Sequence, residues 1–550
     1  MALEPIPHQK CSQHDKTNSP TSVTKTMAIR LKFINKKNNM SENNINSKYS
    51  ILRKFAIIAI LMTSITSYAQ HIPNVEDVGP AAMPQQIAPI TAPFDFPQLS
   101  KPDFGQRRYV IKLKKGQKAT KTIQAAIERM AKQGGGTVVV PQGKWTTGRI
   151  ELKSRVCLEI PRGAELHFTG DIIDYQPEVF TRDEGMELYS TGAYIYANGQ
   201  ENIGITGDGV ISGVDPDCEL YTRNQSMDLD PEVLVDKTPL EKRHFNGIDT
   251  KEVFLPKSIS PINCRNVLIE GITLRNTLYW NIVPQYCENV VIRGVTVESY
   301  GHGRTDGLDV ESCKNTLVEY CSLDCGDDCY TIKSGRGKDG IRVNRPTENV
   351  VIRYCLAKRG AGALVLGSET AGNMNNIYMH DCVFTGTSQG FRFKTRRPRG
   401  GGGHDITIER IRASLKGRAF YNDMLGSVRW AGNLAMRLPA QPVGPLTPDY
   451  HSIRISDVVI DSCSTLIDVQ SLPEMPLRNV LLTGWKARCQ KFMKMHDVKG
   501  FVMENCHIDA IDPKAEIDGC EGVMMLNCTT TNPPVWQYGT ELPSTKVMVK

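Results

Sequence analysis

The sequence lacks an apolar run long enough to cross a membrane as a helix. A transmembrane helix needs about 20 consecutive apolar residues. The longest candidate, FAIIAILMTSITSYA at residues 55–69, is shorter than that and includes polar residues. We therefore expect no membrane span.

The short apolar run instead has the features of an export signal. Basic residues precede it, and the small-x-small sequence Ser67-Tyr68-Ala69 ends it before Gln70. This pattern is typical of a secretory signal and predicts a leader over residues 1–69, with Met27 or Met40 as an alternative start. Because residue 70 is not cysteine, no lipid anchor is expected. The rest of the chain is predicted to be exported to a periplasm or to the extracellular space.

Beyond the leader the sequence also lacks a net charge. Ten of the 66 Lys and Arg residues and three of the 59 Asp and Glu residues lie in residues 1–69. The remainder therefore carries 56 charges of each sign. A balanced chain of this kind gives no global attraction to nucleic acid or to an anionic membrane, so neither is an expected partner.

Cysteine is plentiful, with 16 residues, of which one lies in the leader. In an exported protein this number predicts disulfides between some of the pairs. Cys321, Cys325 and Cys329 are spaced like metal ligands, but four strand residues separate two sulfurs by about 13 Å. One zinc ion needs Zn–S bonds of about 2.3 Å, so we expect these cysteines to stack in a core and predict no metal or other cofactor.

Short β-branched runs that follow polar or Asn-containing turns recur along the chain, most of them roughly 21 to 34 residues apart. That spacing is typical of a solenoid. The leucine framework and interleaved helices of leucine-rich repeats are absent, which favours a parallel β-helix. The runs include NIGITGDGVISG, NVLIEGITLRN, NVVIRGVTVES, NTLVEYCSLDC, NVVIRYCLAKR, NIYMHDCVFTG, DITIERIRASL, SIRISDVVIDS, NVLLTGWKARC, GFVMENCHIDA and GVMMLNCTTTN.

Alternation within each run indicates which side chains face the core. Val267, Ile269 and Ile272 are expected to point inward, while Glu270 and Arg293 point outward. Stacked coils bring equivalent positions about 4.8 Å apart, so each face becomes a long row of side chains suited to a linear polymer.

The region before the repeats divides into two parts. Residues 70–105 are rich in proline and polar residues and predict either an extended arm lying on the body or a mobile linker. The following segment, TIQAAIERMA at residues 122–131, has helical apolar spacing and ends before a glycine run. We interpret it as a capping helix at the start of a single β-helix domain, residues 106–550.

Two segments concentrate carboxylates at the ends of predicted strands. Asp306 and Asp309 lie in RTDGLD, and Asp327 and Asp328 lie in GDDCYTIKSG, in consecutive coils. Asp306, Asp327 and Asp328 should therefore crowd together, which raises the pKa of at least one carboxyl. One protonated and one ionised carboxyl are what glycosidic bond hydrolysis requires. The alternative is that these are ordinary turn residues or calcium ligands.

A basic segment follows two or three coils later. Arg392 and Lys394 alternate onto one strand face, where they could hold the carboxylate of an acidic sugar. Arg396, Arg397 and Arg399 come next, and they could equally form a solvated strand edge.

With these motifs in order, the chain resembles glycoside hydrolase family 28, the polygalacturonase family, over about residues 106–530. The resemblance implies an all-β, right-handed parallel β-helix with an N-terminal capping helix. It rests on TIQAAIERMAKQGGGTVVVPQGKWTTGRIELKS and GAELHFTGD near the start, then LYW, TDGLD, GDDCYTIKSG and RFK in that order.

The resemblance implies an inverting hydrolysis and a role for each matched residue. Asp327 would be the general acid, and Asp306 and Asp328 would activate the attacking water. Arg392 and Lys394 would clamp the substrate. The predicted substrate is an acidic plant cell-wall polysaccharide, pectin, or its oligosaccharides, and the enzyme is expected to act as a monomer.

Other matched positions support or depart from the family pattern. Asp309 is interpreted as a hydrogen-bonded support. Gly360-Ala361-Gly362 replaces the family's Gly-His-Gly, and Arg304 replaces an asparagine. His302 could supply an imidazole from another coil, or it could be an exposed turn residue; His302 and Arg304 are both candidate substrate contacts.

Two other functions remain open at this stage. A calcium-dependent lyase would share the β-helix but would leave unsaturated products. A non-catalytic pectin-binding protein would keep the groove without turnover, as the loss of the histidine at position 361 suggests.

Overall fold

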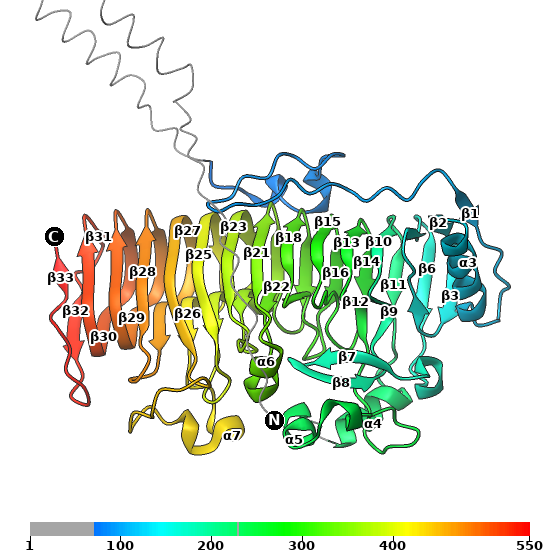
Figure 1. The fold of residues 1–550 in the computed structure, drawn as a ribbon. Coiled ribbons are helices and arrows are strands. Elements are labelled where there is room, and N and C mark those ends of the chain that lie inside the picture. The colour runs from blue at the N-terminus through cyan, green and yellow to red at the C-terminus, as the bar shows by residue number, and fades with distance from the viewer. Residues whose placement is uncertain (1–70, 228–229) are drawn as a thin grey trace, which may run out of the picture. The chain divides into compact units, whose positions relative to one another are not determined.

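The computed structural model describes residues 71–227 and 230–550, so the predicted leader lies outside the described residues. The described chain winds as a right-handed parallel β-helix, with coils stacked one behind another (Figure 1). The predicted fold class is therefore confirmed. Among the described residues no helix has the length and apolar character needed to span a membrane.

Three parallel sheets form the walls of the coil. The first sheet contains β1 (Arg108–Val110), β2 (Gly136–Val139), β5 (Val156–Glu159), β10 (Glu201–Thr206), β13 (Arg265–Glu270), β15 (Glu288–Arg293), β18 (Lys314–Glu319), β21 (Thr347–Arg353), β28 (Leu477–Thr483) and β33 (Met548–Val549). The second contains β3 (Gly143–Thr147), β6 (Ala164–Phe168), β11 (Val210–Ser212), β14 (Thr273–Arg275), β16 (Thr296–Ser299), β19 (Ser322–Cys325) and β31 (Thr529–Thr530).

The third sheet carries the candidate site. Its strands are β4 (Ile150–Glu151), β9 (Ala193–Asn198), β12 (Lys257–Ile262), β17 (Leu308–Glu311), β20 (Tyr330–Lys333), β24 (Thr387–Lys394), β26 (Arg418–Asp423) and β32 (Val535–Tyr538). Longer strands turn a corner and belong to more than one sheet: β22 (Leu356–Leu366), β23 (Met374–Phe384), β25 (Gly402–Ser414), β27 (Asp449–Gln470), β29 (Lys486–Glu504) and β30 (His507–Leu526).

Apolar side chains stack through the core in register. On the first sheet Ile269 pairs with Ile292, Ile292 with Val318, and Val318 with Ile352. All four side chains are buried. Each coil alone has too little apolar surface to fold, so burial against its neighbours supplies the stabilisation, at about 25 cal/mol for each Å² removed from water.

The turn before the first sheet explains the recurrent asparagine. Asn266, Asn289, Asn315 and Asn349 all have φ between 55° and 59°, in the left-handed region that asparagine tolerates better than most residues. Each side-chain amide donates to the amide oxygen of the preceding coil, at 3.0–3.2 Å. The polar turn residues therefore form a hydrogen-bonded ladder that keeps the coils in register.

The predicted capping helix is α3 (Thr120–Lys132), which covers the first coil (Figure 1). Ile123, Ile127 and Met130 are buried against the core. The helix ends at Lys132, and three residues later Gly135 takes φ of 115°, where a Cβ would lie 2.6 Å from the carbonyl oxygen of Arg155. The glycine run is therefore required by close packing as well as by backbone conformation.

Residues 71–105 lie against the outer face of the first sheet, and their short helical turns are η1 (Val75–Asp77) and η2 (Pro80–Ala82). Ile90 packs on Leu268 and Val291. Arg293, expected to point outward, does so but is fully buried beneath this segment, where its guanidinium donates to the carbonyl oxygens of Pro84 and Gln85.

The expectation of disulfides is wrong for the described residues, because all of their cysteines are free. Most are buried at equivalent positions of successive coils, as with Cys321, Cys355 and Cys382. They act as small apolar side chains in a stack, which was the interpretation favoured for Cys321, Cys325 and Cys329.

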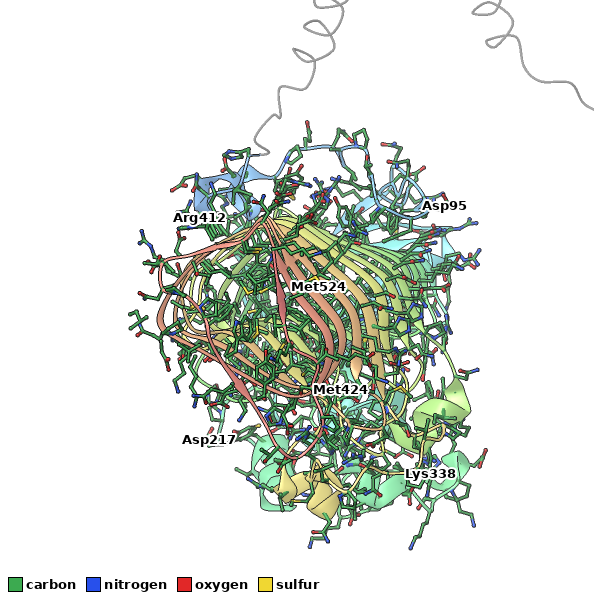
Figure 2. All side chains as sticks on the ribbon, turned by 90° about the vertical axis from the view of Figure 1, so that its left-hand side faces the viewer. Asp95, Asp217, Lys338, Arg412, Met424 and Met524 are labelled. Atoms are coloured by element: carbon green, nitrogen blue, oxygen red, sulfur yellow. The ribbon has the colours of Figure 1, made fainter. Side chains whose placement is uncertain are left out.

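Insertions between coils gather on one side, opposite residues 71–105 (Figures 1 and 2). Viewed along the axis, Asp95 of that segment and Lys338 of α6 lie on opposite sides of the coil (Figure 2). The insertions are the antiparallel pair β7 (Val179–Asp183) and β8 (Met186–Ser190), α4 (Glu219–Met227), α5 (Pro231–Val235), α6 (Gly337–Val343), α7 (Val428–Ala431), and the short turns η3 (Ile172–Tyr175), η4 (Leu240–Lys242) and η5 (Gly432–Ala435).

Candidate active site

The backbone places Asp306 and Asp328 on neighbouring coils. The amide of Gly307 donates to the carbonyl oxygen of Asp328 at 2.8 Å, at the point where β17 and β20 begin. On the other side of Asp306, both the backbone amide and Nδ2 of Asn281 donate to its carbonyl oxygen, each at 2.9 Å. The adjacency that the sequence predicted is therefore present, and it is held by ladder hydrogen bonds.

The next coil requires small residues beneath the carboxylates. The amide of Ala361 donates to the carbonyl oxygen of Asp327 at 2.9 Å. A Cβ on Gly360 would lie 2.5 Å from that same oxygen, and one on Gly362 would lie 3.0 Å from Oδ1 of Asp328. Ala361 therefore occupies the position where the family pattern has histidine, directly beside Asp327.

Arg392 and Lys394, which lie two coils further on, reach Asp328. On β24, Lys394 donates from Nζ to Oδ2 of Asp328 at 2.6 Å, and Nη1 of Arg392 lies 3.9 Å from Oδ1. The Arg392 guanidinium also lies over the ring of Tyr421, 5.6 Å from its centroid. The structure thus brings both predicted cations to the carboxylate cluster, with both side chains partly exposed.

A third cation, Lys333, lies inside the cluster. Nζ of Lys333 is 3.0 Å from Glu369, 3.5 Å from Asp309 and 3.7 Å from Asp306, and all four side chains are buried. It also lies 4.1 Å from the centroid of the Trp280 ring, within cation–π range. This lysine joins carboxylates on the coil before its own to a carboxylate on the coil after it.

The sequence contained Lys333 and Glu369 within recognised motifs, but no role was predicted for either. The available signal was a charged residue at the end of an otherwise apolar strand, TIK and LVLGSE. Asp309 also differs from its expected role as a hydrogen-bonded support. Its carboxylate oxygens accept no hydrogen bond from the described residues, and Lys333 is its ionic contact.

Burial raises the pKa of three of the four aspartates. For Asp306, burial and then the charges of Asp309 and Asp327 hold the pKa well above its ordinary value. Burial raises the pKa of Asp309 to about 7, against the partial opposition of Lys333. The pKa of Asp327 is raised by burial and then by the neighbouring Asp328.

The pKa of Asp328 is shifted in the opposite direction. Burial alone would raise its pKa, but Lys394 and Arg392 outweigh burial and lower it. Because these groups interact strongly, their protons belong to the cluster as a whole. The site can therefore hold an ionised carboxylate at Asp328 beside protonated carboxyl groups, which is the pairing that acid–base cleavage of an acetal needs.

Arg304 and His302, the two other candidate contacts, lie to one side. Nη2 of Arg304 is 3.0 Å from Glu184, in the turn between β7 and β8, and its guanidinium lies 4.8 Å from the centroid of the Tyr279 ring. The ring of His302 packs edge-on against Tyr221. No hydrogen bond joins that ring to the aspartates in the described part of the chain. His302 lines a separate pocket of about 370 Å³ on the N-terminal side of the cluster.

The described residues contain no group of three or more His, Cys, Asp or Glu side chains arranged to hold a metal ion.

Comparison with known proteins identifies relatives. The family model described as glycosyl hydrolases family 28 matches residues 242–416, which include the four aspartates, Arg392 and Lys394. A probable polygalacturonase of Vitis vinifera is 28% identical over 379 residues, which are 66% of this chain and 70% of the relative. An exo-poly-alpha-D-galacturonosidase of Dickeya chrysanthemi is 27% identical over 52% of this chain, and the match spans about half, 51%, of that enzyme.

Solved structures agree with the sequence relatives. A hyperthermoactive exopolygalacturonase from Thermotoga maritima superposes with a TM-score of 0.64 at 28% identity, covering 73% of this chain and 93% of that one. A family 28 exopolygalacturonase of Yersinia enterocolitica, at 20% identity and a TM-score of 0.55, covers 82% of this chain and 79% of that one and shares the fold. The fold and the carboxylate cluster define a glycosidase built on a parallel β-helix. The family model over residues 242–416, together with these relatives and solved structures, supports glycoside hydrolase family 28 for this chain.

Proposed function

We propose that the protein hydrolyses a galacturonic-acid-containing pectic polysaccharide or oligosaccharide with inversion at the anomeric carbon. The observation that carries the proposal is that two adjacent carboxyl groups of the cluster have pKa values shifted in opposite directions. Asp327 has a raised pKa, and Asp328, the next residue, has a lowered one. Inverting glycosidases need one carboxyl that donates a proton and one carboxylate that activates water.

Asp327 is the general acid in this scheme. Burial and the negative charge of Asp328 favour the protonated form of its carboxyl. It is also the most exposed of the three, since Asp306 and Asp328 are buried. Its proton is therefore both available and accessible to a glycosidic oxygen. Protonating that oxygen allows the leaving sugar to depart as an alcohol rather than as an alkoxide.

Asp328 and Asp306 activate the water. The lowered pKa of Asp328 favours its ionised form, and its buried Oδ1 accepts no hydrogen bond from described residues, so this oxygen can accept a proton from a water that is bound in the site. Asp306 lies on the neighbouring coil and shares the remaining protons of the cluster with Asp309 and Asp327. As the reaction proceeds, the cluster gains one proton from water and loses one to the leaving group.

Arg392 and Lys394 give the site its preference for an acidic sugar. Both are partly exposed beside Asp328, and both can form charge-assisted hydrogen bonds to a sugar carboxylate. The relatives named above support this proposal, because their names describe enzymes that act on polygalacturonate.

Product analysis on a panel of pectic oligosaccharides tests the proposal. New reducing ends without ultraviolet absorbance are expected, and Asp327→Asn should abolish them. Products that absorb ultraviolet light would indicate elimination rather than hydrolysis. Binding without cleavage across the panel would favour a glycan-binding protein, as the alanine at position 361 suggests.

We also infer that the protein is exported, because residues 1–69 have the pattern of a secretory signal. Expression in a secreting host, followed by N-terminal sequencing of the exported protein, tests this. An N-terminus at Gln70 is expected, and retention of the whole chain inside the cell would contradict the inference.

A further inference from the structure

Three arginines that follow β24 have three different environments. Arg397 is buried and forms two hydrogen bonds to Glu474, at 2.6 and 2.7 Å. Arg399 is buried and donates to Glu369 at 2.6 Å. The guanidinium of Arg396 forms no hydrogen bond or ion pair with any residue in the described ranges, and the side chain is only partly exposed. Arg397 and Arg399 therefore do not form the solvated strand edge that the sequence allowed. Arg396 differs from both, because its side chain has no anionic partner among the described residues.

The surroundings of Arg396 are unfavourable for a cation. Burial lowers its pKa to about 10, and the positive charges of Arg399 and Arg336 act in the same direction. A guanidinium held partly out of water beside two others costs free energy unless an anion compensates it. Arg336 is already compensated by Glu184, Asp230 and Glu232, and Arg399 by Glu369. An anion placed against Arg396 would supply the missing partner.

Arg396 lines a pocket of about 560 Å³ between α5, α6 and the segment after α7. That volume falls within the range of ordinary ligand pockets, roughly 300–1,000 Å³. Its acidic members are already paired: Glu232 and Asp230 contact Arg336 at 2.6 and 3.2 Å, and Asp236 lies 3.6 Å from Lys338. Among the described lining residues, Arg396 and Lys237 are the charged side chains that form no ion pair, and both are cations.

The remaining lining suits a sugar. Val233, Leu434 and Leu446 give the pocket apolar surface against which the C–H face of a sugar ring can pack. A short chain of contacts connects the pocket to the reacting groups. Arg399, beside Arg396, contacts Glu369, and Glu369 contacts Lys333, which lies 3.7 Å from Asp306.

We propose that Arg396 binds a second carboxylate of the glycan, on a sugar other than the one that faces Arg392 and Lys394. This inference rests on the proposed function, because it assumes an acidic glycan in the groove. It makes Arg396 a specificity-determining residue: the enzyme would require two carboxylates on different sugars of its substrate. A planar guanidinium matches a carboxylate with two parallel hydrogen bonds, which gives geometric selectivity as well as attraction.

The test measures binding, so that it does not depend on turnover. Asp327→Asn protein is titrated calorimetrically with a galacturonate trisaccharide and with its fully methyl-esterified form. Adding Arg396→Gln should weaken binding of the acidic trisaccharide roughly 10- to 100-fold, the usual worth of a hydrogen bond between charged groups. It should leave the already weak binding of the ester unchanged. Arg396→Lys should retain part of the affinity.

Arg488→Gln, at an exposed arginine on β29, is the matched control and should bind like the parent. The melting temperature separates a binding role from a structural one. Removing an uncompensated cation should leave the melting temperature unchanged or raise it, whereas loss of a structural arginine would lower it. Equal affinity of the Arg396→Gln and Arg488→Gln proteins, or no binding of the trisaccharide at all, would overturn the subsite. Weakened binding in an enzyme that cleaves nothing would uphold the subsite and reject the proposed hydrolysis.

Discussion

Nζ of Lys394 lies 2.6 Å from Oδ2 of Asp328, which is two coils earlier in the solenoid. This pairing gives the lysine a second role besides the substrate contact that we propose for it. Together with Arg392 it keeps the pKa of Asp328 low although the carboxyl is fully buried. In the proposed mechanism the same residue therefore both attracts the acidic sugar and keeps Asp328 ionised.

Replacing Lys394 by glutamine should displace the pH–rate profile. Without the ammonium, burial dominates and the pKa of Asp328 rises, so the acidic limb of kcat/KM moves to higher pH. At the optimum, kcat/KM should fall roughly 10- to 100-fold, because a charge-assisted contact is lost. Lys394→Arg, which keeps the charge, should retain the position of the limb. If the acidic limb of the Lys394→Gln protein lies at the same pH as that of the parent, Lys394 does not control the pKa of Asp328.

Asp309→Asn should change how stability depends on pH. The pKa of Asp309 is about 7 in the folded protein, above its ordinary value of 3.8. The folded state therefore binds this proton more tightly than the unfolded state, and the associated stability is present below about 4 and lost as pH rises through 7. The amide mimics the protonated carboxyl, so the variant should lose less stability between pH 4 and pH 8.

Urea denaturation across that pH range checks this, with exposed Asp95→Asn as the control. At pH 8 the Asp309→Asn protein should be at least as stable as the parent. A slope against pH equal to that of the parent would show that Asp309 is ionised in the folded protein.

Gly362→Ala should disturb the site by steric contact alone. The added methyl group would lie 2.3 Å from Cγ2 of Val365 and 3.0 Å from Oδ1 of Asp328. Overpacking of this kind typically costs about 1–3 kcal/mol of stability. Activity should fall further than stability explains, because Asp328 must move. Gly444→Ala, where nothing lies within 4 Å of the new Cβ, is the matched control. Full activity in Gly362→Ala would mean that the position of Asp328 is not critical.

Reducing agent should leave the melting temperature unchanged. All cysteines in the described ranges are free, and most are buried as apolar side chains. Calorimetry with and without dithiothreitol measures this directly. A fall in melting temperature of several degrees under reduction would indicate a disulfide that stabilises the fold.

The β-helix was predictable because its signal is local. Strand alternation, the recurrent Asn turn and the amphipathic segment that became α3 each depend on neighbouring residues. The disulfide expectation failed because cysteine count and export say nothing about whether two sulfurs meet. In a solenoid, equivalent core positions such as Cys321 and Cys355 stack as small side chains instead.

The candidate site was predictable only in part, for a related reason. Asp306 and Asp328 could be placed together because their coils are consecutive and each carries a recognisable motif. The contact between Lys333 and Glu369 joins residues 36 positions apart, and it depends on the length of the intervening coil. The burial of Arg293 depends on residues more than 200 positions earlier. Neither contact can be predicted from the periodic pattern of the sequence.

Proton NMR of the first-formed product tests the central claim most directly. If Asp327 donates to the leaving oxygen while Asp328 and Asp306 direct a water to the opposite face, the new reducing end must first appear with the anomeric configuration opposite to that of the substrate linkage. Asp327→Asn should produce no such signal. A product that first appears with the configuration of the substrate would contradict the account, because it would require a covalent intermediate on one of these aspartates.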